Sequence, residues 1–254
     1  MELELWLVAL LCAMFFLTGI MDGISGGGGL ITLPVLLLTG LPPEVAFGTN
    51  KVIAYTGMSV SLGNYARSGF VAWKTALTGI PPMALGAVLG AKMLLSLDSA
   101  MIGKIVVLLL PIGILATFMP KKEKASRDLL SADLYVRLPI ICFVLGFYEG
   151  FFGPGSGTFM TLAFHVFLGL GLIHSVATAK MIMMVGGIGG MIVFLLGGHV
   201  NWLLALPCAA FNIAGNFIGS NYAMRFGTGL VRRFLLFSLI LLFISLIWKF
   251  WIEG

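Results

Sequence analysis

Long apolar runs recur along this chain and restrict the folds that it can adopt. Of its 254 residues, 59% are hydrophobic and 10% are charged, whereas a soluble domain carries about 25% charged residues. Several runs reach roughly twenty residues with few or no charges, which is the length that crosses a bilayer as a helix. Because the runs are continuously apolar and lack the alternation of a barrel strand, helices are the expected spanning form. The sequence therefore predicts an all-α polytopic membrane protein.

Two glycine-rich breaks interrupt the apolar runs, and the same kinds of residue accompany both. The first break reads DGISGGGGL from Asp22, and the second reads EGFFGPGSG from Glu149. A lysine, Lys51 or Lys180, lies inside the long apolar segment that follows each break. Ionisable groups are costly at membrane depth, so the recurrence of one acid and one lysine in both halves indicates a functional site.

The two halves of the chain also match in register. A shift of 129 positions pairs Thr49 with Thr178 and Lys51 with Lys180, while the two acidic residues need a shift of 127. The same shift of 129 pairs Gly57, Gly69, Trp73, Gly86 and Gly90 with Gly186, Gly198, Trp202, Gly215 and Gly219. The glycines spaced Gly-x-x-x-Gly indicate close helix packing. We therefore predict a first transmembrane repeat over 1–120, a polar linker over 121–134 and a second repeat over 135–254.

Each repeat is expected to hold five helical segments. In the first repeat they lie at about 3–21, 30–41, 43–65, 75–96 and 100–119, and in the second at about 135–149, 158–170, 172–196, 202–224 and 230–250. Lysines and arginines gather in short loops between these segments, and such loops are usually cytoplasmic. With the basic loops inside, both chain ends lie outside, and the two repeats have inverted topology.

The segment after each break is too short to span a bilayer. At 1.5 Å per residue these segments cover roughly 16–20 Å of a core about 30 Å thick, so each is expected to be a half-helix that begins near mid-membrane. Two helix N-termini would converge there and offer free N–H groups to an anion. The predicted anion site joins Lys51 and Lys180 to residues at the breaks and beside the lysines, namely Gly28, Gly29, Leu30, Thr49, Asn50, Gly157, Thr158 and Thr178.

The lysines also allow a structural interpretation. Each could neutralise the acidic residue of its own repeat, Lys51 with Asp22 and Lys180 with Glu149, because buried charges usually pair. Both interpretations hold together if an anion competes with the carboxylates for the lysines, which would make a coupling device. A weaker pathway signal comes from Asn212 and Asn216, which lie four apart on one helix face; hydrogen bonding between helices is the favoured explanation of the two.

Several kinds of chemistry have no support in the sequence. It contains no HExxH, no GxSxG and no carboxylate pair one helix turn apart within a segment, so an enzyme is not expected. His165, His174 and the three cysteines have no metal-ligand spacing, and neither a metal nor a cofactor is expected. The net charge of +5 belongs to loops between apolar segments and predicts topology, not nucleic-acid binding.

The motifs resemble those of the TauE/SafE sulfite exporter family of membrane permeases. The resemblance rests on GGGGLITLP from Gly26, on AFGTN from Ala46 and on GFYEGFFGPGSG from Gly146, and it covers essentially the whole chain. It implies transport of sulfur-containing anions such as sulfite, thiosulfate, organosulfonates or sulfoacetate. Pro154 and Ser156 stand where the family more often has further small residues, which suggests that the two halves contribute unequally.

The leading hypothesis is a secondary transporter that moves a small anion by alternating access between the two repeats. Its expected partners are the anion, the lipid bilayer and a coupling proton or cation, and its expected location is a prokaryotic inner membrane. A passive anion channel or a non-transporting membrane scaffold is the alternative, ahead of an intramembrane enzyme.

Overall fold

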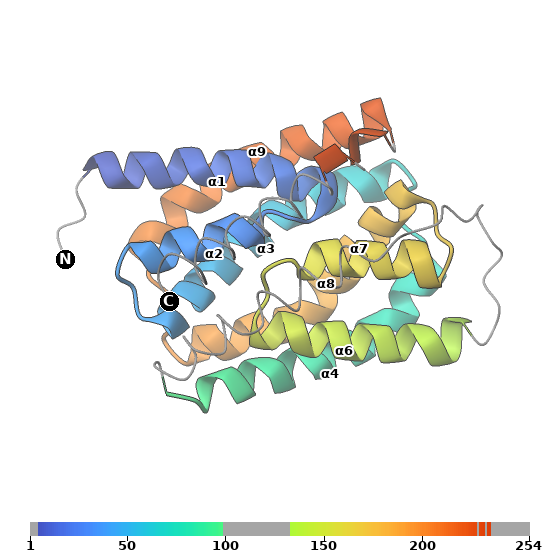
Figure 1. Cartoon of the computed structure of the whole chain (residues 1–254), viewed down its shortest axis with the longest axis horizontal. Coiled ribbons are helices and arrows are strands. Elements are labelled where there is room, and N and C mark those ends of the chain that lie inside the picture. Colours follow the sequence, from blue (N-terminus) through green and yellow to red (C-terminus); the bar gives the residue numbers. More distant parts are fainter. Residues whose placement is uncertain (1–4, 99–132, 228, 232, 235–254) are drawn as a thin grey trace, which may run out of the picture.

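The computed structural model describes residues 5–98, 133–227, 229–231 and 233–234 of the chain (Figure 1). Every regular element in these ranges is helical, as predicted. In order they are α1 (Leu5–Ser25), α2 (Gly29–Leu38), α3 (Pro43–Arg67), α4 (Trp73–Leu95), the short π-helical turn η1 (Asp133–Arg137), α6 (Leu138–Phe151), α7 (Ser156–Phe167), α8 (Leu172–Leu196) and α9 (Trp202–Phe226). The segments expected at about 100–119 and 230–250 and the linker over 121–134 lie largely or wholly outside the described residues.

Within the part of the chain that the structure describes, five stretches are long and apolar enough to cross a membrane. They are Trp6–Ser25, Trp73–Leu95, Asp133–Phe151, Leu172–Leu196 and Trp202–Phe226. The helix α3 is as long as α8, with 25 residues, but it carries buried polar side chains such as Thr49, Lys51 and Ser61. It packs against α8 and α9 as well as α1 and α2. The surrounding helices therefore shield the polar side chains of α3 from lipid.

The two segments that follow the breaks are short helices, as predicted. The helix α2 has 10 residues and α7 has 12, so at 1.5 Å per residue they are about 15 and 18 Å long. Neither length reaches across a hydrocarbon core of about 30 Å. Both helices lie among the longer ones, with α7 against α8 and α2 against α3.

Both breaks begin later than predicted. The helix α1 was expected to end near Met21, but it continues to Ser25, so that Asp22 lies in its last turn. Glu149 likewise lies in the last turn of α6, before the break. Gly23 remains helical because it packs tightly against α9, where an added Cβ would meet the Asn216 carbonyl oxygen at 2.7 Å. The change of direction comes at Gly26, whose φ of 80° a residue with a side chain rarely adopts.

Glycines set the closest helix contacts. The helix α1 lies along α9, and α4 lies along α6 (Figure 1). A Cβ added at Gly215 would meet the backbone of Phe16 on α1, and one added at Gly86 would meet the backbone of Phe143 on α6. The prediction that these repeat-matched glycines serve helix packing is confirmed, since only a residue without a side chain permits so close an approach.

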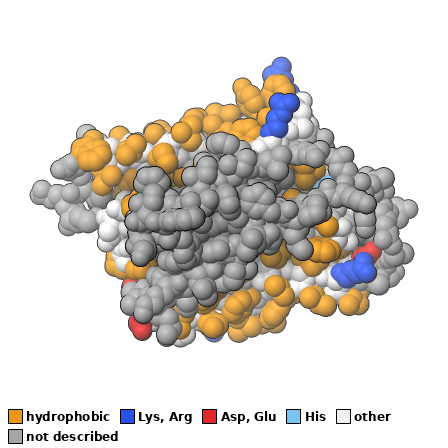
Figure 2. Space-filling model, viewed as in Figure 1, with side chains coloured by type: hydrophobic (Ala, Val, Ile, Leu, Met, Phe, Trp, Pro, Cys, Tyr) orange, Lys and Arg blue, Asp and Glu red, His pale blue; other side chains and the backbone are white. Residues whose placement is uncertain are grey.

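The outer surface suits a hydrocarbon environment. Figure 2 shows hydrophobic side chains over most of the described part of the visible face, with basic side chains near helix ends. Large apolar residues that are half exposed or more include Trp6, Leu77, Leu203 and Phe217. Contiguous exposed apolar surface of this kind marks contact with an apolar partner, and with spans of this length that partner is lipid.

Substituting the packing glycines should loosen the bundle. We expect Gly86→Ala and Gly215→Ala each to lower the free energy of unfolding by about 1–3 kcal/mol, because the added methyl group meets the backbone of the neighbouring helix. The control is Gly63→Ala on α3, where an added Cβ meets nothing within 4 Å. It should be neutral or stabilising by up to about 1 kcal/mol. Thermal unfolding midpoints in detergent measure all three, and equal midpoints for the three variants would contradict the packing role.

Candidate functional site

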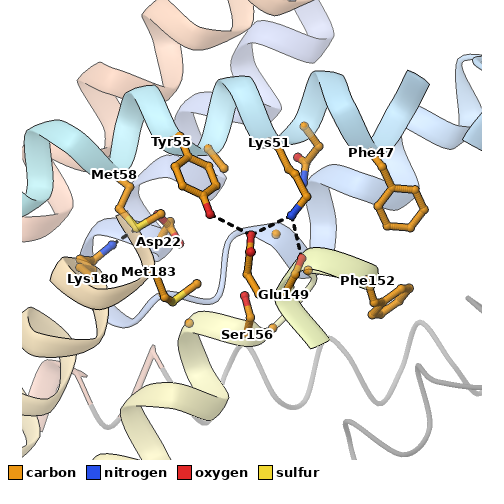
Figure 3. A pocket seen from close by; sticks show the side chains of 17 residues that line it. Asp22, Phe47, Lys51, Tyr55, Met58, Glu149, Phe152, Ser156, Lys180 and Met183 are labelled. Carbon is orange, nitrogen blue, oxygen red and sulfur yellow. Dashed lines mark hydrogen bonds and ion pairs between the residues drawn. The ribbon is translucent and has the colours of Figure 1, made fainter. Parts of the chain in front are cut away.

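Lys51 and Glu149 form a buried ion pair at the centre of the bundle (Figure 3). The Nζ atom of Lys51, on α3, lies 2.8 Å from Oε1 of Glu149, at the end of α6, and donates a second bond of 2.7 Å to the Glu149 carbonyl oxygen. The Tyr55 hydroxyl donates to the same carboxylate oxygen at 3.1 Å. Both charged side chains are about 95% buried, which such groups tolerate only when paired.

Lys180 and Asp22 form a second, looser pair. The Nζ atom of Lys180, on α8, lies 3.4 Å from Oδ2 of Asp22 at the end of α1. The Lys180 side chain is 4% exposed, but that of Asp22 is 19% exposed. The Asp22–Lys180 pair is therefore both longer and more open than the pair of Lys51 and Glu149.

The expected pairing within each repeat is wrong. The structural interpretation, one of the two left open, paired Lys51 with Asp22 and Lys180 with Glu149, but the structure exchanges the partners. The physical reason is the helix packing. The helix α6, from the second half of the chain, packs against α4 from the first half, and α1, from the first half, packs against α9 from the second. The end of α6 then lies within reach of the Lys51 side chain on α3, and the end of α1 lies within reach of the Lys180 side chain on α8. Each ion pair therefore joins one predicted repeat to the other.

The two glycine breaks meet beside these ion pairs. A Cβ added at Gly157 would meet the Gly26 carbonyl oxygen at 2.6 Å, so the two breaks touch backbone to backbone. The second break is held by the Tyr148 hydroxyl, which donates to the Pro154 carbonyl oxygen at 2.7 Å. This contact between breaks brings the start of α2 and the start of α7 to one place. First-turn N–H groups lack partners within their own helix and suit negative charge.

A cavity of about 60 Å³ lies between the ion pairs and the breaks. All four charged residues line it, together with Gly26, Gly29, Phe47, Asn50, Ala54, Tyr55, Met58, Phe152, Gly153, Gly155, Ser156, Gly157 and Met183. Figure 3 shows the two lysines approaching it from opposite sides, with Glu149 and Ser156 between them. A water molecule needs about 10–15 Å³ by the same measure, so the cavity has room for a small polyatomic ion.

Four residues of the predicted anion site, three glycines and Asn50, line cavities near the ion pairs. Gly29, Asn50 and Gly157 line the large cavity. Gly28 lines a smaller cavity beside Asp22, which also touches Gly29 and Asn50.

The predicted threonines and Leu30 do not line the large cavity. The Thr49 hydroxyl accepts the Asn201 N–H at 2.9 Å, and the Thr178 hydroxyl accepts the Ala72 N–H at 3.0 Å. Each of these two threonines anchors the loop that precedes a long helix. Leu30 and Thr158 are buried in the first turns of α2 and α7.

Asn212 bridges two helices, as one of the two interpretations predicted, and Asn216 supports it from the same helix. The Asn212 side-chain amide donates to the Phe15 carbonyl oxygen on α1 at 3.1 Å, and Asn216 donates to the Asn212 side-chain oxygen at 3.1 Å. Asn212 also lines the smaller cavity, so it has a place beside the site as well. The bridge and the cavity wall are made by the same side chain.

Tyr55 and Ser156 belong to the site but were not predicted. Tyr55 lies one helix turn after Lys51, and the i, i+4 spacing places both on one face of α3. That spacing was readable in the sequence. Ser156 begins α7 and lines the cavity, but it had been treated only as a departure from a family pattern. The histidines make structural contacts: a His165 ring nitrogen bonds to the Leu170 carbonyl oxygen and His174 packs edge-on against Phe70.

The arrangement can bind an anion only by exchanging partners. Two lysines and two carboxylates balance one another, so an added anion gains a lysine when a carboxylate gives it up. Within the described part of the chain, no three His, Cys, Asp or Glu side chains are grouped to hold a metal ion. The chemistry available in the large cavity is therefore charge recognition by ammonium groups and backbone N–H donors.

The exchanged pairing predicts which double variant recovers stability. Lys51→Met alone leaves Glu149 buried without its cation and should cost about 3–5 kcal/mol of unfolding free energy. Adding Glu149→Leu should restore most of the loss, because an apolar pair of similar volume is often neutral. The matched control combines Lys51→Met with Asp22→Asn, which should restore nothing. Unfolding midpoints in detergent compare the two double variants. The pairing would be contradicted if Asp22→Asn, and not Glu149→Leu, restored the stability lost in Lys51→Met.

Comparison with known proteins gives one consistent result. Residues 11–246 match the family described as Sulfite exporter TauE/SafE. A "Probable membrane transporter protein" of Haemophilus influenzae is 37% identical over 234 residues, which cover 91% of each chain. Another, ORF9 of a Sinorhizobium species, is 34% identical over 97% of this chain and 94% of its own, and YfcA of Escherichia coli is 33% identical over 88% and 84%. No solved structure matches the chain.

The helical spans, the buried charges and these relatives agree. The chain is an integral, multi-pass membrane transporter that belongs to the TauE/SafE sulfite exporter family.

Proposed function

We propose that the protein is a secondary transporter that moves a small anion, a sulfur oxyanion or organosulfonate, by alternating access between two inverted repeats. The observation that carries this proposal is the position of Lys51 and Lys180 on opposite sides of one cavity at the start of two short helices. Buried lysines in a membrane protein mark ion or substrate pathways. The family description names sulfite, an anion small enough for a cavity of about 60 Å³.

The proposed site supplies two kinds of donor. The lysines provide positive charge, and the starts of α2 and α7 provide backbone N–H groups through Gly29 and Gly157. Broken helices whose N-termini point at an anionic substrate group are a recurrent feature of transporters built from repeats. The Ser156 hydroxyl adds a neutral donor at the start of α7 only, because the residue in the corresponding first position of α2 is Gly29.

Matched contacts support the two repeats. The helices α3 and α8 begin and end 129 positions apart, at 43 and 172 and at 67 and 196. The hydrogen bonds of Thr49 and Thr178 to loop N–H groups are related by the same shift. The pairing of α1 with α9 corresponds to the pairing of α6 with α4. Two sets of equivalent contacts are what an internal two-fold relation between repeats produces.

Helix ends support the proposed orientation. Arg67, Lys74, Arg137 and Arg225 belong to ends of α3, α4, η1 and α9 that lie on one side of the bundle (Figure 1). Lys92 is at the other end of α4. Among these ends of the described helices, four basic residues against one support the proposal that the first side faces the cytoplasm of a prokaryotic inner membrane.

The ion pairs explain how binding could drive the change between states. Because each pair joins the two repeats, an anion that takes a lysine from its carboxylate weakens a contact between them. The Lys180–Asp22 pair is the one that opens more easily, since it is 3.4 Å long against 2.8 Å and its carboxylate is more exposed. A ligand moves a two-state equilibrium only through such a difference in interactions between the states.

Anion binding should be measurable as thermal stabilisation of the purified protein. The panel is sulfite, thiosulfate, sulfate, sulfoacetate, taurine and phosphate, and a ligand at about 100 times its Kd should add roughly 2.7 kcal/mol of unfolding free energy. Lys180→Met should abolish the effect of the binding anion. The double variant Lys51→Met with Glu149→Leu should do the same while remaining folded.

The control for lost charge is Lys92→Met, because Lys92 is an exposed lysine far from the cavity lining. It should keep the full stabilisation. The proposal fails if no anion in the panel stabilises the wild type, or if the folded lysine variants respond as the wild type does. Saturable uptake with counterflow in proteoliposomes then separates a transporter from a passive channel, which shows no counterflow.

A further inference from the structure

A second, smaller cavity lies directly behind Asp22. Its volume is about 20 Å³, enough for one particle of the size of a water molecule. Its polar walls come from four elements: Asp22 on α1, Thr32 on α2, Asn50 on α3 and Asn212 on α9. None of the described residues that line it is cationic. The small cavity thus differs in kind from the large one, into which both lysines point.

One oxygen atom in this wall has no bonding partner. The side-chain oxygen of Asn50 is buried, and no hydrogen bond to it is present within the described structure. Buried polar atoms are nearly always satisfied, by protein or by a bound species. An oxygen can be satisfied by a donor or by a cation, and no described protein donor lies within hydrogen-bonding distance of this one.

The amide of Asn212 is held in one orientation. Its nitrogen donates to the Phe15 carbonyl oxygen at 3.1 Å, and its oxygen accepts from Asn216 at 3.1 Å. A carbonyl oxygen has two lone pairs, so one remains for a species in the cavity. Gly57 allows this arrangement, because a Cβ at position 57 would collide with the Asn212 side-chain oxygen.

The other repeat lacks the two amide oxygens at the matching positions. The shift of 129 positions places Ala179 opposite Asn50 and Met83 opposite Asn212. Both are fully buried, with Ala179 at 1% and Met83 at 0% exposure. Met83 packs against Gly186 just as Asn212 packs against Gly57. An apolar thioether therefore fills the position at which the first site presents an amide oxygen.

We propose that the cavity walled by Asp22, Thr32, Asn50 and Asn212 binds one sodium ion per chain. Carboxylate, hydroxyl and amide oxygens are ligands for hard cations. A single carboxylate supplies one negative charge, which matches a monovalent ion. Unwound helix segments at mid-membrane hold coupling cations in other transporters with internal repeats.

The position of Asp22 links this cation to the anion site. Asp22, Gly29, Asn50 and Ala54 line both cavities. A cation on the Asn50 side attracts the Asp22 carboxylate away from Lys180, whose bond is already long at 3.4 Å. Lys180 is then free for an anion. The link between the two ions rests on the proposed function, whereas the sodium site itself does not.

Sodium binding can be tested without any transported anion. The unfolding midpoint of the full-length protein in detergent is measured against sodium gluconate, with choline gluconate at equal ionic strength as reference. We expect a saturable rise with sodium only, and radioactive sodium should bind one ion per chain. An equal rise in choline, or a midpoint that follows pH and ignores sodium, would overturn the sodium site.

Substitutions that copy residues from the other repeat test where the sodium ion binds. Asn50→Ala and Asn212→Met install the residues found at the equivalent positions, and each should need at least tenfold more sodium for half of the shift. Asn221→Ala is the control, because Asn221 is partly exposed on the same helix as Asn212 and lines neither cavity, and it should respond as the wild type does. Wild-type responses from both site variants would overturn the proposal.

Two further measurements keep the result interpretable. If Asn50→Ala does not fold, Asn50→Asp retains an oxygen and should bind sodium at least as tightly; a folded Asn50→Asp protein without a sodium response overturns the site. Half-saturation by sulfite should need several-fold less sulfite when sodium is present. A sulfite response that is the same with and without sodium overturns the link between the ions and leaves the anion site standing.

Discussion

The cost of holding charges inside a bundle that crosses a lipid bilayer governs this structure. Lys51, Glu149 and Lys180 are nearly fully buried, and Asp22 is four-fifths buried. Such charges persist only in pairs, and each pair here takes one member from each half of the chain. The helix packing, the touching breaks and the glycine contacts all serve to bring these distant residues together. A rearrangement of the two halves must therefore change at least one ion pair, which makes the charges the natural point for a substrate to act.

The two halves of the chain match in the bounds of their long helices but differ in the side chains around their carboxylates. The helices α3 and α8 have matching bounds, and each carries its lysine at the ninth position. In contrast, Tyr55 bonds to Glu149, and the shift of 129 places Met184 at the matching position in the second half of the chain. The Asp22 side has an oxygen-lined cavity instead. One half thus holds its carboxylate firmly and the other holds it loosely, which is an arrangement suited to a defined order of events during transport.

Much of the fold was predictable from the sequence, because hydrophobic length and glycine clusters act locally. The short helices after the breaks and the bounds of α8 followed from the run lengths alone. The pairing of the charges was not predictable in this way. Sequence proximity favoured Lys51 with Asp22, whereas the actual partner, Glu149, is 98 positions away and is placed by helix packing. Thr49 was likewise predicted to bind the anion. In the structure its hydroxyl accepts a hydrogen bond from the Asn201 N–H, in a loop of the other half of the chain.

The central claim is that an anion lies between the two lysines. Selenite is the selenium analogue of sulfite, and anomalous diffraction from crystals grown with selenite locates the selenium atom without ambiguity. The account predicts one selenium peak in the cavity, within hydrogen-bonding distance of Lys51 or Lys180 and beside the start of α7, and no such peak in the double variant Lys51→Met with Glu149→Leu. A peak found only at the basic helix ends, or in the cavity but out of reach of both lysines, would contradict it.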